Sequence, residues 1–138
     1  MMKITSMLGT AALLAALSVS ATPAPEGARV YFLSPADGEV LSGEFTVRFG
    51  LEGMGVAPAG VEKENTGHHH LLINADPMPD LTMPLPASDQ VRHFGGGQTE
   101  TRLSLPPGQY RLQLVVGDAQ HAPHQPPIMS ESIQVTVE

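Results

Sequence analysis

The amino-acid sequence predicts an all-β fold, an immunoglobulin-like or cupredoxin-like Greek-key sandwich of about seven strands that follows a cleaved signal peptide. Three observations predict this class. Short apolar and β-branched runs alternate with turn residues after residue 27. The 138-residue chain contains 14 glycines and 13 prolines, which favours many turns. No helical periodicity persists over three turns after residue 22, so we expect no long helix there.

The first 21 residues have the pattern of an export signal. Lys3 supplies a positive charge, residues 7–19 are almost wholly apolar, and small residues end the segment at Ala21. The apolar run is shorter than the about 20 residues that a membrane-spanning helix needs. We therefore expect cleavage after Ala21, a periplasmic or secreted protein, and no stable membrane insertion. A retained membrane anchor is the alternative.

After the signal, residues 22–27 predict a flexible leader and residues 28–138 a single sandwich domain. Residues 29–33 form the first expected strand, which ends at a Ser-Pro-Ala-Asp-Gly turn. Residues 44–49 alternate cleanly and place their two phenylalanines and a valine on one face. Residues 68–74 end apolar on both faces, which is typical of a central strand.

The second half of the chain predicts three further strands and one irregular one. Residues 76–86 hold too many prolines for a central strand, so we expect only an irregular strand within residues 76–90. A Pro-Pro-Gly turn separates the alternating residues 99–105 from residues 110–116, and residues 132–137 close the fold.

Composition excludes several functional classes. Without Lys3 the expected mature chain has six Lys and Arg (7 − 1) against 14 Asp and Glu, a net charge of −8 with histidine neutral. Such an acidic chain does not suit nucleic acid, so we expect no nucleic-acid partner. The absence of cysteine excludes disulfides, thiolate metal sites and cysteine nucleophiles.

The six histidines are the most informative residues, and all of them lie beside long loops. Under an immunoglobulin strand order, the loops that carry them share one pole of the sandwich. Two histidines that are two positions apart on a strand project from one face, whereas the residue between them points to the other face. We therefore expect His69 to point away from its two neighbours. The other five are predicted to form one metal site: His68, His70, His93, His121 and His124.

The predicted ligand of this site is a divalent transition metal, with copper favoured and zinc next. Imidazole suits both ions, and copper stands above zinc in its affinity for nitrogen ligands. We expect three or four histidines to bind the ion and Asp118 to orient one ring. Met129 completes a His-x2-His-x4-Met pattern similar to cupredoxin loops, although gap-filling in the core explains it better. Met78 and Met83 are likewise expected to pack.

Three functions remain open at this point. The first is a metal carrier or buffer. The second is a non-catalytic structural domain that binds a periplasmic protein partner, with the histidines bracing its long loops. The third is a metal-dependent enzyme of unknown substrate, which needs a general base such as Glu64 or Glu100. No sequence feature identifies a substrate, so the enzyme ranks last.

Three long stretches carry a resemblance to a known family. They are GMGVAPAGVEKENTGHHHLLIN, HFGGGQTETRLSLPPGQYRLQLVVGD and HAPHQPPIMS, preceded by SPADGEVLSGEFTVRFGLE. Together they resemble a bacterial exported family known as domain of unknown function 4399. Asn74 stands where an acidic residue is expected of that family. The resemblance implies a small exported β-domain with a histidine-rich motif set, and it implies no activity.

Overall fold

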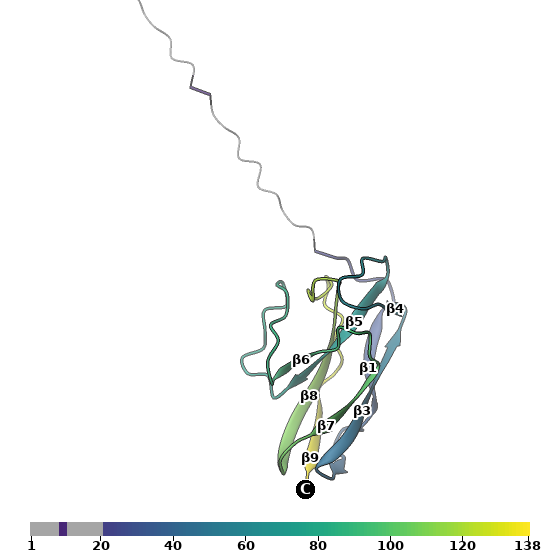
Figure 1. Cartoon of the computed structure of the whole chain (residues 1–138), viewed down its shortest axis with the longest axis vertical. Helices are drawn as coiled ribbons and strands as arrows, with labels where there is room; N and C mark the ends of the chain where they lie inside the picture. The colour runs from purple at the N-terminus through teal and green to yellow at the C-terminus, as the bar shows by residue number, and fades with distance from the viewer. Residues whose placement is uncertain (1–8, 11–20) are drawn as a thin grey trace, which may run out of the picture.

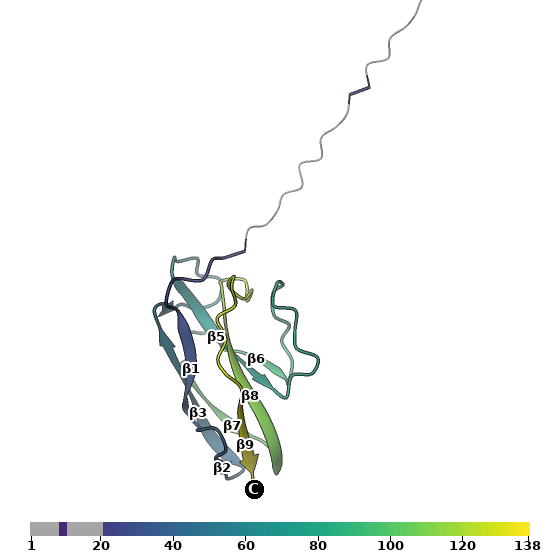
Figure 2. The same cartoon turned by 180° about the vertical axis from the view of Figure 1, so that it is seen from behind.

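The computed structural model describes residues 9–10 and 21–138 of the chain. Most of the expected signal peptide therefore lies outside the described residues. Within them the strands form two packed layers, drawn from opposite sides in Figures 1 and 2. No helix in this part of the chain is long and apolar enough to cross a membrane.

The smaller sheet has three antiparallel strands in the order β1-β3-β7. Their bounds are β1 Arg29–Ser34, β3 Glu44–Glu52 and β7 Glu100–Ser104. The larger sheet has the order β2-β9-β8-β5-β4, and β6 also pairs with β5. Its bounds are β2 Val40–Leu41, β4 Gly55–Val56, β5 Thr66–Ile73, β6 Val91–His93, β8 Gly108–Gly117 and β9 Ile133–Val137.

These sheets confirm the predicted all-β sandwich, with nine strands in place of about seven. Two of the additional elements, β2 and β4, are only two residues long and are too short to show a periodicity. No strand lies within residues 76–90. The short strand near this position is β6, which starts at Val91 after the prolines have ended.

The main core lies between the two sheets and follows from strand alternation. The predicted inward face of β3 is confirmed, because Phe45, Val47 and Phe49 are all buried. They pack in one cluster with residues from the larger sheet, among them Leu71 and Leu114. Strands β5 and β8 lie side by side in the larger sheet, where they pair from His68↔Gly117 to Ile73↔Leu112.

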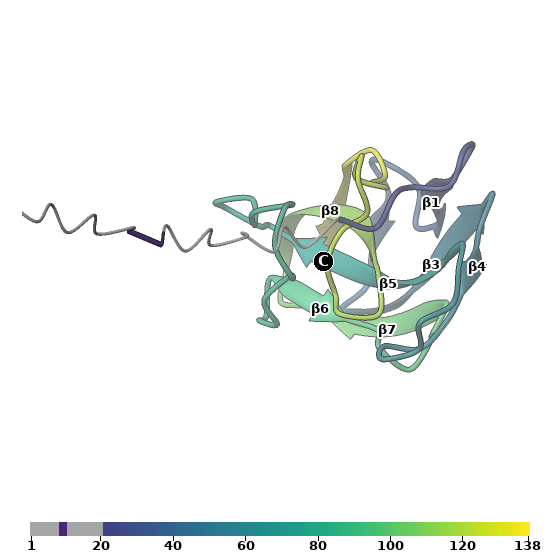
Figure 3. The same cartoon turned by 90° about the horizontal axis from the view of Figure 1, so that it is seen from above.

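A second apolar cluster covers the outer face of the larger sheet. Its buried members are Leu72, Ala75, Leu85, Val91 and Val115. They come from β5, β6, β8 and the proline-rich segment, which folds over the sheet. Figure 3 shows the yellow-green connection after β8 also passing over β5. Strand β5 is therefore buried on both faces, as predicted for a central strand.

The segment expected to be a flexible leader is joined to the domain by backbone hydrogen bonds. The Gln125 amide donates to the Thr22 carbonyl at 2.8 Å, and the Ala24 amide donates to the Gln125 carbonyl at 3.0 Å. Pro23 and Gln125 form a parallel bridge between these bonds. The chain thus pairs with the β8–β9 connection from its first residue after Ala21.

Candidate metal centre

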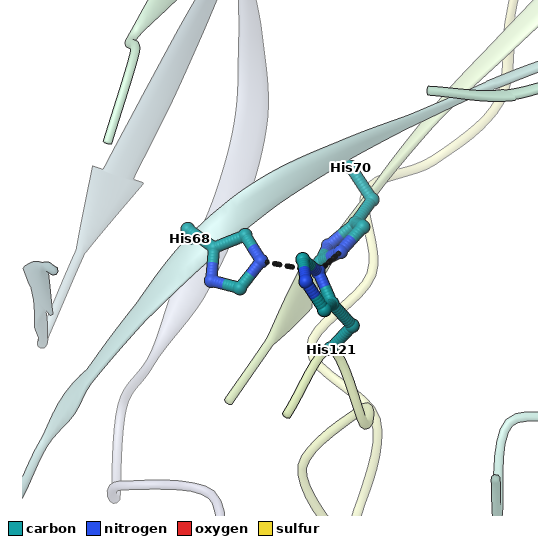
Figure 4. Close-up of side chains that lie close together, drawn as sticks. All are labelled: His68, His70 and His121. Carbon is teal, nitrogen blue, oxygen red and sulfur yellow. Dashed lines mark hydrogen bonds between the residues drawn. The ribbon is translucent and has the colours of Figure 1, made fainter. Parts of the chain in front are cut away.

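Three histidines converge on the outer face of the larger sheet. His68 and His70 come from β5, and His121 comes from the β8–β9 connection (Figure 4). The Nε2 atom of His68 lies 2.9 Å from Nδ1 of His121, and Nε2 of His70 lies 3.2 Å from the same atom. The three ligand atoms lie within 4.8 Å of one another. We call these three residues the histidine cluster.

The strand period explains which β5 histidines meet. His68 and His70 point to the outer face, whereas His69 points into the main core, as predicted. The His69 ring lies 4.9 Å from the Phe49 ring, and neither ring nitrogen has a hydrogen-bond partner among the described residues. His69 is therefore outside the histidine cluster.

The absence of a side chain at Gly117 makes room for the cluster. Gly117 pairs with His68 across the β5–β8 ladder and is buried. A Cβ atom built at this position would lie 2.5 Å from Cε1 of His70, closer than real Cβ contacts come. The His70 ring occupies this space, so a larger residue at 117 would displace it.

Asp118 shapes the tight turn that presents His121. Its Oδ1 accepts the amides of Gln120 at 2.9 Å and Ala122 at 3.0 Å, one on each side of His121. The His121 amide donates to the Asp118 carbonyl, and His121 has a left-handed φ of 64°. The carboxylate was expected to orient a histidine ring. No hydrogen bond joins it to a ring among the described residues, and it holds the loop backbone instead.

His93 packs against the cluster without joining its ligand atoms. It lies opposite His70 in the β5–β6 ladder. Its ring centroid is 4.5 Å from that of His70 and 4.4 Å from that of His121. Its Nε2 lies 3.2 Å from the Pro86 carbonyl oxygen and donates to it. In the neutral ring with its hydrogen on Nε2, Nδ1 of His93 carries the lone pair.

His124 is buried beside Gly67 of β5, the residue that precedes His68. A Cβ built at Gly67 would lie 3.0 Å from Cε1 of His124. The Nδ1 atom of His124 is buried and has no hydrogen-bond partner in the described part of the chain. Of the five predicted ligands, the structure thus brings together the nitrogens of three, packs the fourth ring against two of them and leaves the fifth nearby.

Burial keeps the β5 histidines neutral. It lowers the pKa of His68 to about 4, with a smaller contribution from His121, and it lowers the pKa of His70 to about 2, with His68 contributing next. Asp118 acts on His68 in the opposite direction. Burial also lowers the pKa of His93. Neutral imidazole is the form that binds metals, so His68 and His70 are in the metal-binding form near neutral pH.

Other residues singled out in the sequence lie elsewhere. Glu100 pairs with Arg48 at 3.7 Å on the smaller sheet. Met129 packs against the outer apolar cluster, which agrees with its expected gap-filling role. Met78 and Met83 are 44% and 57% exposed, so the expectation that they pack was wrong.

Sequence reasoning missed several groups that build the site. Gly117 could have been noticed as a glycine at the end of an apolar strand, although nothing local says which ring it accommodates. The Leu85 amide donates to the His121 carbonyl at 2.8 Å, and the Pro86 carbonyl holds His93. Both are backbone groups of the proline-rich segment, residues 76–86. Their roles depend on this segment folding over the larger sheet, which no local sequence pattern predicts.

Comparison with known proteins adds a family and one distant structural likeness. No curated protein matches the chain. An endo-beta-1,4-mannanase from Thermotoga petrophila has a similar region with a TM-score of 0.47 and 18% identity. The match covers 80% of this chain and 20% of the mannanase chain, so this chain spans about a fifth of that protein. The model of the family described as Domain of unknown function (DUF4399) matches residues 47–138, and the chain belongs to this family.

Proposed function

We propose that this protein binds a divalent transition metal through Nε2 of His68, Nε2 of His70 and Nδ1 of His121. One observation carries the proposal, namely that two histidine nitrogens lie 2.9 and 3.2 Å from the same third nitrogen. Two ligands that are 2.0–2.1 Å from one ion and subtend 90–109° are about 2.8–3.4 Å apart. These two spacings therefore match ligands of a single ion.

Hydrogen bonding alone does not satisfy all three nitrogens of the histidine cluster. A neutral imidazole nitrogen carries either one hydrogen or one lone pair, so Nδ1 of His121 can make one good hydrogen bond. Two histidine nitrogens nevertheless compete for it. A cation at the centre of the cluster would use one lone pair from each ring and would satisfy all three nitrogens.

The ligand set favours copper, with zinc next. The described cluster consists only of imidazoles and contains no carboxylate or thioether. Imidazole binds both ions, and copper has the higher intrinsic affinity for nitrogen ligands. His93 is the fourth ligand that we assign, because its ring packs against those of His70 and His121. Three fixed ligands and one adjustable ligand suit a carrier or buffer, which must exchange its ion.

The site is proposed to work after export. The apolar run and the small residues ending at Ala21 support cleavage there and a periplasmic or secreted location. Mass spectrometry of the exported protein tests this part. A chain that begins at Thr22 supports it, and an intact Met1 in the soluble fraction would contradict it.

The central experiment is a thermal shift on the tag-free mature protein with copper(II), zinc(II) and a chelator. Binding only to the folded state at a hundredfold excess over Kd stabilises by about 2.7 kcal/mol, which raises Tm by about 10 °C for a domain of this size. His121→Asn is the test variant, since asparagine tolerates the left-handed φ of residue 121. His69→Leu, on the other face of β5, is the matched control.

The same experiment tests the second candidate function, a non-catalytic domain that binds a protein partner and uses its histidines as braces. The observation in its favour is that His121 bridges the β8–β9 connection to β5. A brace predicts a lower Tm in His121→Asn and no metal-dependent rise in any variant. A metal site predicts a rise in the wild type and in His69→Leu that His121→Asn loses. An enzyme stays last, because Glu100 is engaged with Arg48 on the smaller sheet.

A further inference from the structure

The negative charge of Asp118 has no positive partner among residues 21–138. The residue is only 8% exposed, and none of the ion pairs in the described chain includes it. Its carboxylate accepts two backbone amides and the hydroxyl of Thr22, whose Oγ1 donates to Oδ2 at 2.7 Å. A buried charge held only by neutral donors is normally balanced by an opposite charge nearby.

The surroundings of Asp118 add further negative charge. A hollow of about 300 Å³ beside Thr22 is lined by Glu62, Glu64 and Asp118, with Lys63 as its only cationic residue. Glu62 accepts a hydrogen bond from the Gln120 side chain at 3.1 Å, in the same turn that carries His121. A single additional positive charge at Thr22 would therefore meet a strongly favourable potential.

The predicted cleavage site lies at this position. Thr22 is the first residue after Ala21, and it is also the first residue that pairs with the domain, through the bond from Gln125 to its carbonyl. The backbone nitrogen of a threonine lies within about 4 Å of its own hydroxyl oxygen. Cleavage would turn that nitrogen from a neutral amide into an ammonium group within about 7 Å of the Asp118 carboxylate.

We infer that the α-ammonium group created at Thr22 by cleavage after Ala21 forms an ion pair with Asp118 and thereby fixes the turn that presents His121. This inference rests on the proposed export and deepens the proposed metal binding. Asp118 accepts the amides on both sides of His121, so its position sets the direction of the His121 ring. The precursor, with a neutral amide at this position, holds the turn less firmly and binds metal more weakly than the mature chain.

The test compares three forms of the mature domain. The first starts at Thr22 with a free amine, the second is acetylated at Thr22, and the third starts at Ser20, which moves the amine two residues away. In the presence of a chelator we expect the free-amine form to melt about 3–8 °C above the other two at neutral pH. Equal melting temperatures of the three forms would overturn the inference.

Asp118→Asn is the partner variant, because asparagine keeps an oxygen acceptor for the Gln120 and Ala122 amides and removes the charge. In this variant the free and acetylated forms should melt together, while Asp89→Asn, an exposed loop carboxylate, should keep the wild-type difference. If Asp118→Asn does not fold, the pKa of the α-amino group in the wild-type mature protein decides instead. A pKa clearly above the ordinary 7.7–8.0 supports the ion pair, and an ordinary value overturns it.

Copper titration of the same three forms separates this inference from the proposed function. A weaker Kd of the acetylated form by threefold or more supports the coupling to His121. Equal Kd values in all three forms would overturn the coupling while leaving metal binding intact. An absence of both copper and zinc binding in every form would overturn the proposed function, whereas the melting difference measured with chelator would still test the ion pair independently.

Discussion

At the scale of single residues, Gly117 decides whether the histidine cluster can form. We predict that Gly117→Ala destabilises the protein by about 1–3 kcal/mol, because the new methyl group would meet the His70 ring at 2.5 Å. It should also weaken metal binding, since His70 must move. Urea unfolding and copper titration measure the two effects. Gly43→Ala is the matched control, because a Cβ there meets nothing within 4 Å. Unchanged unfolding in Gly117→Ala would contradict the packing argument.

His69 is a second case in which one residue can be tested in isolation. It is 1% exposed, packs on Phe49 and leaves both ring nitrogens without partners among the described residues. We expect His69→Leu to be neutral or stabilising at pH 7, because an apolar side chain of similar volume removes two unsatisfied polar atoms. Thermal unfolding without metal measures this. A loss above about 2 kcal/mol would show that the imidazole makes a polar interaction that this structure lacks.

At the scale of elements, one buried hydroxyl adds to the backbone bonds that join β8 to the segment before β9. Ser130 is buried, its Oγ accepts the Leu114 amide at 2.8 Å, and it donates to the Glu131 carbonyl at 2.8 Å. Ser130→Ala leaves the buried Leu114 amide without that partner, which should cost about 1–3 kcal/mol of unfolding free energy. The exposed Ser132→Ala is the control and should change stability little. Equal effects of the two substitutions would refute this role.

Elements of this fold differ in how far the sequence predicts them. The alternation in residues 44–49 and 110–116 identified β3 and β8, because one face of each meets the main core. The strands β2, β4 and β6 hold two or three residues each, so no period can appear in them. Their pairing depends on neighbours that are distant in sequence. For the histidine cluster, strand period places His68 and His70 on one face. His121 is predicted at the site only through the assumed strand order, and its position depends on a turn built by Asp118.

At the scale of the whole molecule, the buried histidines make stability dependent on pH. Burial lowers the pKa of His68 and His69 to about 4 and that of His70 to about 2, whereas the unfolded chain has the ordinary value of about 6.5. Below pH 6.5 the unfolded state therefore binds more protons than the folded state. Stability is full above about pH 6.5 and falls as the pH drops toward 4, by up to about 1.4 kcal/mol per pH unit for each such histidine.

Chemical denaturation of the metal-free protein between pH 7 and pH 4 measures this dependence. His69→Leu removes one titrating group and should flatten the slope, while leaving the contribution of the other two. A stability that is constant over this range in the wild type would mean that the three histidines are accessible to protons in the folded state.

The cover over the outer face of the larger sheet has a kinetic consequence. His70 is fully buried and His121 is half-buried, so we expect a chelator to reach an ion at the cluster only after a local opening of the loop that carries His121. The rate of ion release should then rise with chelator concentration at first and reach a plateau set by the opening rate. Stopped-flow release at increasing chelator concentration measures that plateau. The residence time of the ion would then be set by the motion of this loop, independently of how tightly three imidazoles hold it.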